Sequence, residues 1–76
     1  MGSFPISKIE DFLIRAAGKI TLGVATPATF HCIEIATAEI ARRDAGNAGR
    51  DACDQTNLRY AKILAARVSE IATAAA

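Results

Sequence analysis

The sequence predicts an all-α protein in which a shorter N-terminal helix precedes an antiparallel helical hairpin. Apolar residues recur at helical spacing along most of the 76-residue chain. Thr26-Pro27 is typical of a helix start, and a glycine-rich break at 46–49 divides the remainder into two long arms. Within a single domain over residues 1–76, we expect helices over 7–22, 27–45 and 48–74. They form either a three-helix bundle or an oligomeric hairpin assembly.

The N-terminal helix is expected to begin with Ser7 as its N-cap. Ser7-Lys8-Ile9-Glu10 fits the capping box, in which the Ser and Glu side chains each accept from the other's backbone N–H. Gly23 is the expected stop, and Gly18 is a candidate kink. The apolar face of this helix carries six residues: Ile9, Phe12, Leu13, Ala16, Ala17 and Ile20.

The hairpin is expected to close along two apolar seams. The seam of the first arm is Phe30, Ile33, Thr37, Ile40 and Asp44. The seam of the second arm is Asn57, Ala61, Leu64, Val68, Ile71 and Ala75. Reflection about a turn centred on Asn47 then pairs Phe30 with Leu64, Thr37 with Asn57, and Asp44 with Arg50. In this register the polar Thr37–Asn57 pair would oppose slippage of the two arms.

Composition indicates a thin core and a nearly neutral surface. Seventeen residues are alanine, which buries little area, and a core of this size seldom supplies more than about 3–5 kcal/mol. We therefore expect self-association. Nine basic and eight acidic residues give a net charge of +1, so nucleic acid is not an expected partner. No apolar run is long enough for a membrane span, and no signal sequence opens the chain, so we expect a cytoplasmic location.

Each predicted helix places one isoleucine away from its core stripe. These residues are Ile14, Ile35 and Ile63, and Ala38 extends the patch around Ile35. Such side chains on so small a chain suggest that a second face is covered by protein. The sequence therefore predicts a small non-catalytic, homo-oligomeric helical protein. It would act by protein–protein interaction, as an adaptor, inhibitor or regulator of a larger partner protein.

No constellation for catalysis, metal binding or a cofactor is expected. His31 and Glu34 are i,i+3 neighbours beside Cys32, but structural zinc requires four ligands with a recognisable spacing. A Cys–His nucleophile is not expected either, because adjacent helical residues point about 100° apart. The predicted register also separates Cys32 from Cys53 too far for a disulfide, which leaves two free thiols and favours a reducing compartment.

An alternative function is an oligomeric binder of a small anionic ligand such as a nucleotide. Small residues at the turn would present backbone N–H groups at a helix N-terminus. The cations that would hold the anion are Arg42, Arg43, Arg50 and Arg59.

A further alternative is a DNA-binding regulator. Residues 22–30, Leu-Gly-Val-Ala-Thr-Pro-Ala-Thr-Phe, resemble the turn and recognition-helix start of helix-turn-helix repressors of the tetracycline-repressor type. This resemblance implies that the helix after Pro27 reads DNA. That helix has one residue too many before Phe30, and it carries Glu34 with no Lys or Arg before Arg42, although phosphate contacts need cations.

Overall fold

The described residues fold into three α-helices, which confirms the all-α prediction. The computed structural model describes residues 5–46 and 52–75, and of residues 52–55 it describes the backbone alone. In order, the helices are α1 (Ile6–Thr21), α2 (Pro27–Gly46) and α3 (Ala52–Ala75). The predicted start of the last helix, residue 48, and the turn centre Asn47 lie outside the described residues.

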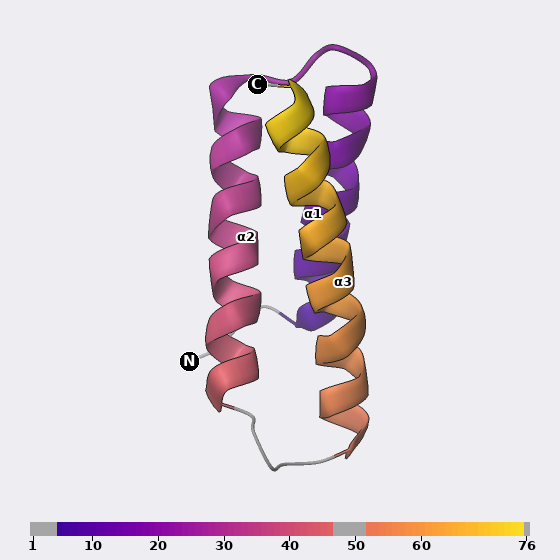
Figure 1. The fold of residues 1–76 in the computed structure, drawn as a ribbon, viewed down its shortest axis with the longest axis vertical. Coiled ribbons are helices and arrows are strands. Elements are labelled where there is room, and N and C mark those ends of the chain that lie inside the picture. Colours follow the sequence, from indigo (N-terminus) through magenta and orange to yellow (C-terminus); the bar gives the residue numbers. More distant parts are fainter. Residues whose placement is uncertain (1–4, 47–51, 76) are drawn as a thin grey trace.

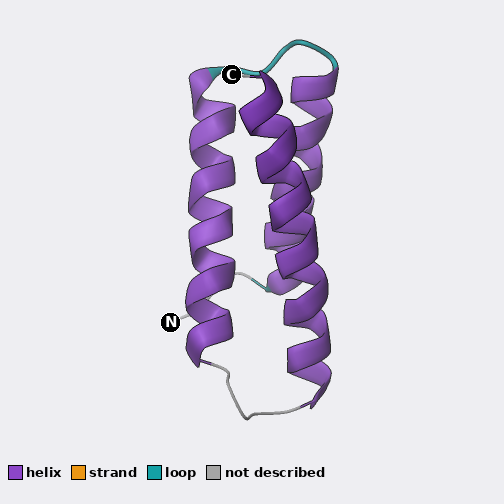
Figure 2. Ribbon diagram, viewed as in Figure 1, coloured by secondary structure: helices purple, strands orange, loops and turns teal. Residues whose placement is uncertain are grey.

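The helices pack side by side into an elongated bundle of 39 × 25 × 15 Å. Each helix contacts both of the others. Figure 1 shows α2 running down the bundle and α3 running back up beside it, with α1 behind them. Helices account for nearly all of the described chain (Figure 2).

α1 ends as the sequence predicts but begins differently. Gly23 has a φ of +75°, its N–H donates to the Ile20 carbonyl (3.1 Å), and the Val24 N–H donates to the Lys19 carbonyl (2.9 Å). These two bonds form a Schellman motif, the usual glycine-dependent helix stop. The predicted capping box at Ser7 is wrong: α1 begins at Ile6, after Pro5, without a side-chain cap. Gly18 does not end the helix, which continues to Thr21.

α2 begins at Pro27, and a pair of threonines stabilises its first turn. Thr26 precedes the helix, and its carbonyl accepts from the Thr29 N–H (2.9 Å). In return, the Thr26 N–H donates to Thr29 Oγ1 (3.1 Å). This second bond is the one that Glu makes in a capping box. Thr29 is buried, and this bond gives its hydroxyl oxygen a hydrogen-bond partner at the start of α2.

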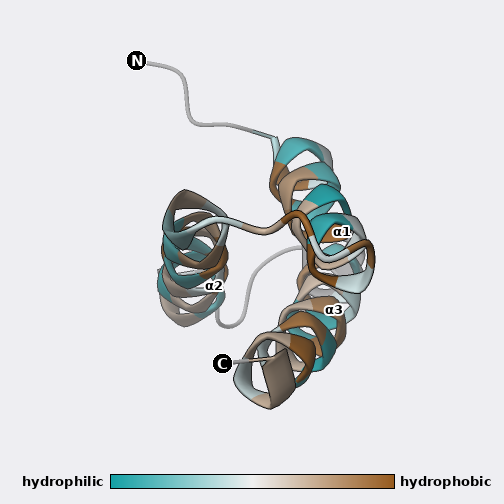
Figure 3. Ribbon diagram, turned by 90° about the horizontal axis from the view of Figure 1, so that it is seen from above, coloured by the Kyte–Doolittle hydropathy of each residue, from teal (hydrophilic) through white to brown (hydrophobic). Residues whose placement is uncertain are grey.

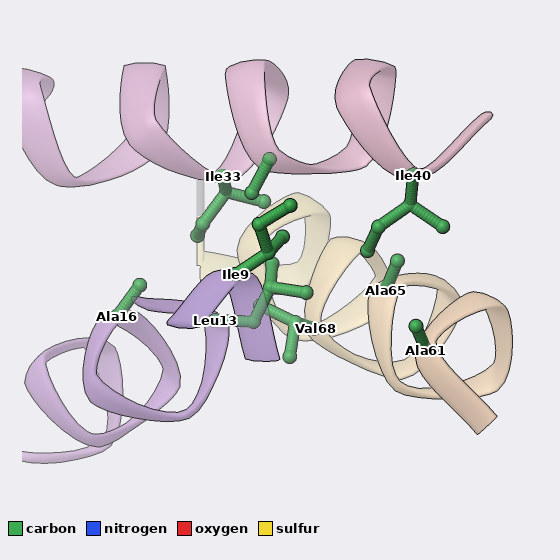
Figure 4. Packing of buried hydrophobic residues seen from close by; sticks show 9 residues of the cluster. Ile9, Leu13, Ala16, Ile33, Ile40, Ala61, Ala65 and Val68 are labelled. Carbon is green, nitrogen blue, oxygen red and sulfur yellow. The ribbon is translucent and has the colours of Figure 1, made fainter. Parts of the chain in front are cut away.

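The core is a single cluster along the bundle axis (Figure 4). Small and large side chains alternate in it, with Leu13 and Ala61 fully buried. The small alanines allow the helix backbones to approach closely. Its buried members are Ile9, Leu13, Ala16, Ile33, Ala36, Ile40, Ala61, Ala65 and Val68. Phe12, which the sequence places on the core face of α1, is instead about half exposed (48%).

The predicted buried stripe of α3 is wrong, because the helix is rotated about its axis relative to the prediction. Asn57 is exposed and Ile71 is 39% exposed, whereas Leu58 and Ala65 are buried. Ala61 and Val68 belong to both the predicted and the observed stripe, so the spacing alone did not select between them. Burial selects the leucine side, because an unpaired amide costs free energy inside a core and a leucine side chain gains it.

The predicted register between α2 and α3 is also wrong. Thr37 does not pair with Asn57, and its hydroxyl has no hydrogen-bond partner. Asp44 forms its ion pair with Lys62 (3.0 Å), about three helical turns farther along the chain than Arg50. Arg50 itself lies outside the described residues. The pairing that reflection about Asn47 predicts for Asp44 is therefore wrong.

Candidate functional site

Three isoleucines on three different helices are each more than half exposed. The exposed fractions are 53% for Ile14, 56% for Ile35 and 54% for Ile63. Ala38 is also exposed. The four residues are distributed over all three helices: Ile14 lies on α1, Ile35 and Ala38 on α2, and Ile63 on α3.

Further large apolar side chains are exposed that the sequence analysis did not single out. Leu22 (78%) and Val24 (59%) lie in the hydrophobic connection between α1 and α2 at one end of the bundle (Figure 3). Phe12, Tyr60 and Ile71 are the others. The sequence could have predicted that Leu22 and Val24 are exposed. Gly23 is the expected helix stop, so its two neighbours lie at the helix end and outside the apolar stripe of the helix.

A groove of about 240 Å³ lies between α1 and α2. Its apolar walls include Phe12 from α1 and Ala28 and Cys32 from α2. Arg15 and Lys19 also line it, and among the residues that the structure describes no carboxylate does. The groove therefore combines apolar walls with two cationic side chains.

A second, wider groove lies between α2 and α3. Its walls are mostly small residues, among them Ala38, Ala41 and Ala72. Phe30, Glu34 and Thr37 also line it. Phe30, predicted as a core seam residue, is half-buried at this edge.

Two of the four predicted anion-binding arginines are bound to a carboxylate of the same helix. Arg43 Nε donates to Glu39 Oε2 (2.7 Å), and Arg42 donates to both Glu39 oxygens. These bonds from Arg42 and Arg43 lower the pKa of Glu39 to about 2. The same contact raises the pKa of Arg42.

The structure brings Arg42 and Arg43, two of the predicted anion-binding residues, together at Glu39. Arg59 is exposed on α3, and Arg50 lies outside the described residues. Lys62, a further cation of α3, is paired with Asp44. Because Arg42 and Arg43 share Glu39, an anion there would compete with a charge-assisted hydrogen-bond network.

The His31 region has the geometry of a solvated helix surface. His31 Nδ1 lies 3.8 Å from Glu34 Oε1, with both side chains more than two-thirds exposed. Cys32 is a free, exposed thiol. Within residues 5–46 and 56–75, no group of three His, Cys, Asp or Glu side chains is placed to hold a metal ion.

Similarity to known proteins assigns no family to the chain. No protein-family model matches it, and neither a curated protein nor a solved structure is significantly similar. In the part of the chain that the structure describes, no helix is both long and apolar enough to cross a membrane.

Proposed function

We propose that this chain is a small, non-catalytic helical protein that self-associates and acts by binding another protein. It would serve as an adaptor, inhibitor or regulator of a larger partner. The observation that supports the proposal is the exposure of Ile14, Ile35 and Ile63, each more than 50%, on three separate helices. An apolar surface spread over a chain this small gains free energy when protein covers it.

The unit that associates is an antiparallel hairpin of α2 and α3 with the shorter α1 packed against it. In this proposal Ile35 and Ala38 of α2, Ile14 of α1 and Ile63 of α3 are contact residues. We assign the protein to the cytoplasm, where the exposed thiol of Cys32 would stay reduced.

Thermal unfolding over a hundredfold range of protein concentration tests self-association. A native oligomer gives a midpoint that rises with concentration, because association stabilises only the folded chain. A midpoint that stays constant across the range would reject the self-association half of the proposal. Far-ultraviolet circular dichroism would follow the transition, because the chain is almost wholly helical.

Binding of a small anion is the second candidate, and the same assay separates it from the first. Arg59 is exposed, and Arg42 keeps 67% of its side chain exposed despite its bonds to Glu39. A nucleotide or inorganic phosphate that binds the native state would raise the midpoint at fixed protein concentration. The DNA-binding alternative ranks behind both, since Arg42 and Arg43 are bound to Glu39 at the far end of α2 from the turn.

A further inference from the structure

The groove between α1 and α2 continues as a stripe along the outside of α2. Ala28 and Cys32 line the groove, and Ile35 follows them at a 4-3 spacing. At about 100° per residue these three positions fall within about 60° of one another, as do the seam positions of a coiled coil. All three side chains are exposed. Because two helices pack along seams with this spacing, a helix of another molecule is a suitable occupant of the groove and stripe.

The charge on the groove is one-sided. Arg15 and Lys19 lie one turn apart on α1 and line the groove. Farther along the same face of α1, outside the groove lining, Lys8 and Asp11 are both exposed. In the described part of the chain, no carboxylate lines the groove. Glu39, the acidic residue one turn beyond Ile35, is already bonded to Arg42 and Arg43.

We propose that this groove docks an acidic amphipathic helix of a partner protein. The inference rests on the proposed function, because it names the chemistry of the protein partner. Apolar side chains of the incoming helix would lie over Ala28, Cys32 and Ile35, and its carboxylates would face Arg15 and Lys19. Helix-in-groove binding of this kind uses apolar anchors at i, i+3 and i+4 spacing.

Two other anionic partners fit the groove less well. A lipid bilayer presents a broad surface, which meets the protruding parts of a protein and not a recess between two helices. A nucleic acid presents phosphates, which would leave the apolar walls at Ala28 and Cys32 uncovered by any apolar group. A second copy of this chain is disfavoured as the occupant of this groove, because positive charge would meet positive charge. The stripe ends at the Glu39 cluster, which has two arginines and one carboxylate.

The rate of thiol modification at Cys32 reports whether the groove is occupied. The experiment uses the full chain with Cys53→Ser, so that Cys32 is the one thiol, and a maleimide reagent. The probes are a 21-residue synthetic helix with Leu at its a and d positions, Glu at its e and g positions and Ala or Gln elsewhere, and a matched helix with Lys in place of Glu. The Glu helix should slow modification at least tenfold, and added salt should restore the rate. The Lys helix should leave the rate unchanged.

Charge reversal in the groove provides the matched variants. Lys19→Glu should abolish the protection by the Glu helix, whereas Arg59→Glu, at an exposed site on α3, should retain it. Circular dichroism of each variant checks that the bundle is intact. Equal protection by both helices, or protection that survives Lys19→Glu, would overturn the charge-based assignment. No protection by the Glu helix would overturn the docking site itself.

Two further arms identify a different occupant. Protection by phosphatidylserine vesicles without protection by the Glu helix would assign the groove to a membrane surface and overturn the proposal. Protection that grows with protein concentration when no probe is present would assign it to a second copy, with the same consequence. The proposed function fails separately, by a concentration-independent melting midpoint, so the two failures are distinguishable.

Discussion

Gly18 and Gly23 show that backbone conformation decides what a glycine contributes. Gly18 lies in the interior of α1 with open space around its α-carbon, whereas Gly23 has a φ of +75°. The sequence predicted the role of Gly23, because a glycine after an amphipathic stretch is a typical helix stop. It could not predict that α1 would begin after Pro5, because Ser7-x-x-Glu10 fits a cap equally well.

Alanine substitutions at the two glycines should therefore have opposite effects. Gly18→Ala should raise the free energy of unfolding by about 1 kcal/mol, since alanine is the better helix former and nothing lies within 4 Å of the added methyl. Gly23→Ala should lower it by about 1–2 kcal/mol, because an L-residue at positive φ is strained. Urea unfolding of both variants measures the difference. A destabilised Gly18→Ala or a stabilised Gly23→Ala would contradict the two assignments.

Thr37 has a buried hydroxyl without a hydrogen-bond partner. Thr37→Val keeps the shape of the side chain and removes the unsatisfied oxygen, so the free energy of unfolding should rise by about 1 kcal/mol. Thr73→Val is the control, because Thr73 is exposed and its hydroxyl donates to the Ser69 carbonyl (2.9 Å). Chemical denaturation of both variants tests the prediction. A loss of stability on Thr37→Val would mean that the hydroxyl has a partner in solution.

At the scale of a helix, hydrophobic spacing predicts that an element exists more reliably than it predicts which side is buried. Both the expected and the observed stripes of α3 contain Ala61 and Val68, and the two differ by a small rotation. The choice between Asn57 and Leu58 could have been made from burial cost alone. The register against α2 could not, because it depends on a connection that the periodicity does not describe.

The rotation of α3 is tested by neighbouring substitutions. Leu58→Ala should cost about 2–4 kcal/mol, because Leu58 is only 5% exposed. Asn57→Ala should change stability by no more than about 0.5 kcal/mol, because Asn57 is exposed. Thermal or urea unfolding gives both values. If Asn57→Ala were the costlier substitution, the originally predicted seam would be correct instead.

The Glu39 cluster is a stabilising element within α2 whose strength depends on pH. The folded pKa of Glu39 is about 2, below its ordinary value of 4.5, because Arg42 and Arg43 hydrogen-bond to the carboxylate. Its contribution is therefore complete above pH 4.5 and is lost as the pH falls towards 2. A carbon-13 NMR titration of the Glu39 carboxyl should give a midpoint near 2. A midpoint close to 4.5 would show that the cluster does not persist in solution.

At the scale of the whole molecule, the all-α class and the exposed isoleucines followed from the sequence, while the grooves did not. Helical spacing places Ile14, Ile35 and Ile63 off the core stripes whatever the register. The groove between α1 and α2 depends on how two helices approach each other, and it combines Arg15 and Lys19 with Cys32. Residues so far apart in sequence become neighbours only when the bundle forms.

The central claim is that the exposed apolar surface is covered by protein, beginning with self-association. Light scattering on a sizing column at two protein concentrations tests it most directly, with Ile63→Glu beside the parent chain. The account predicts a mass well above 8.0 kDa for the parent chain, and a lower mass with unchanged helicity for Ile63→Glu. A monomer of 8.0 kDa at both concentrations would contradict it.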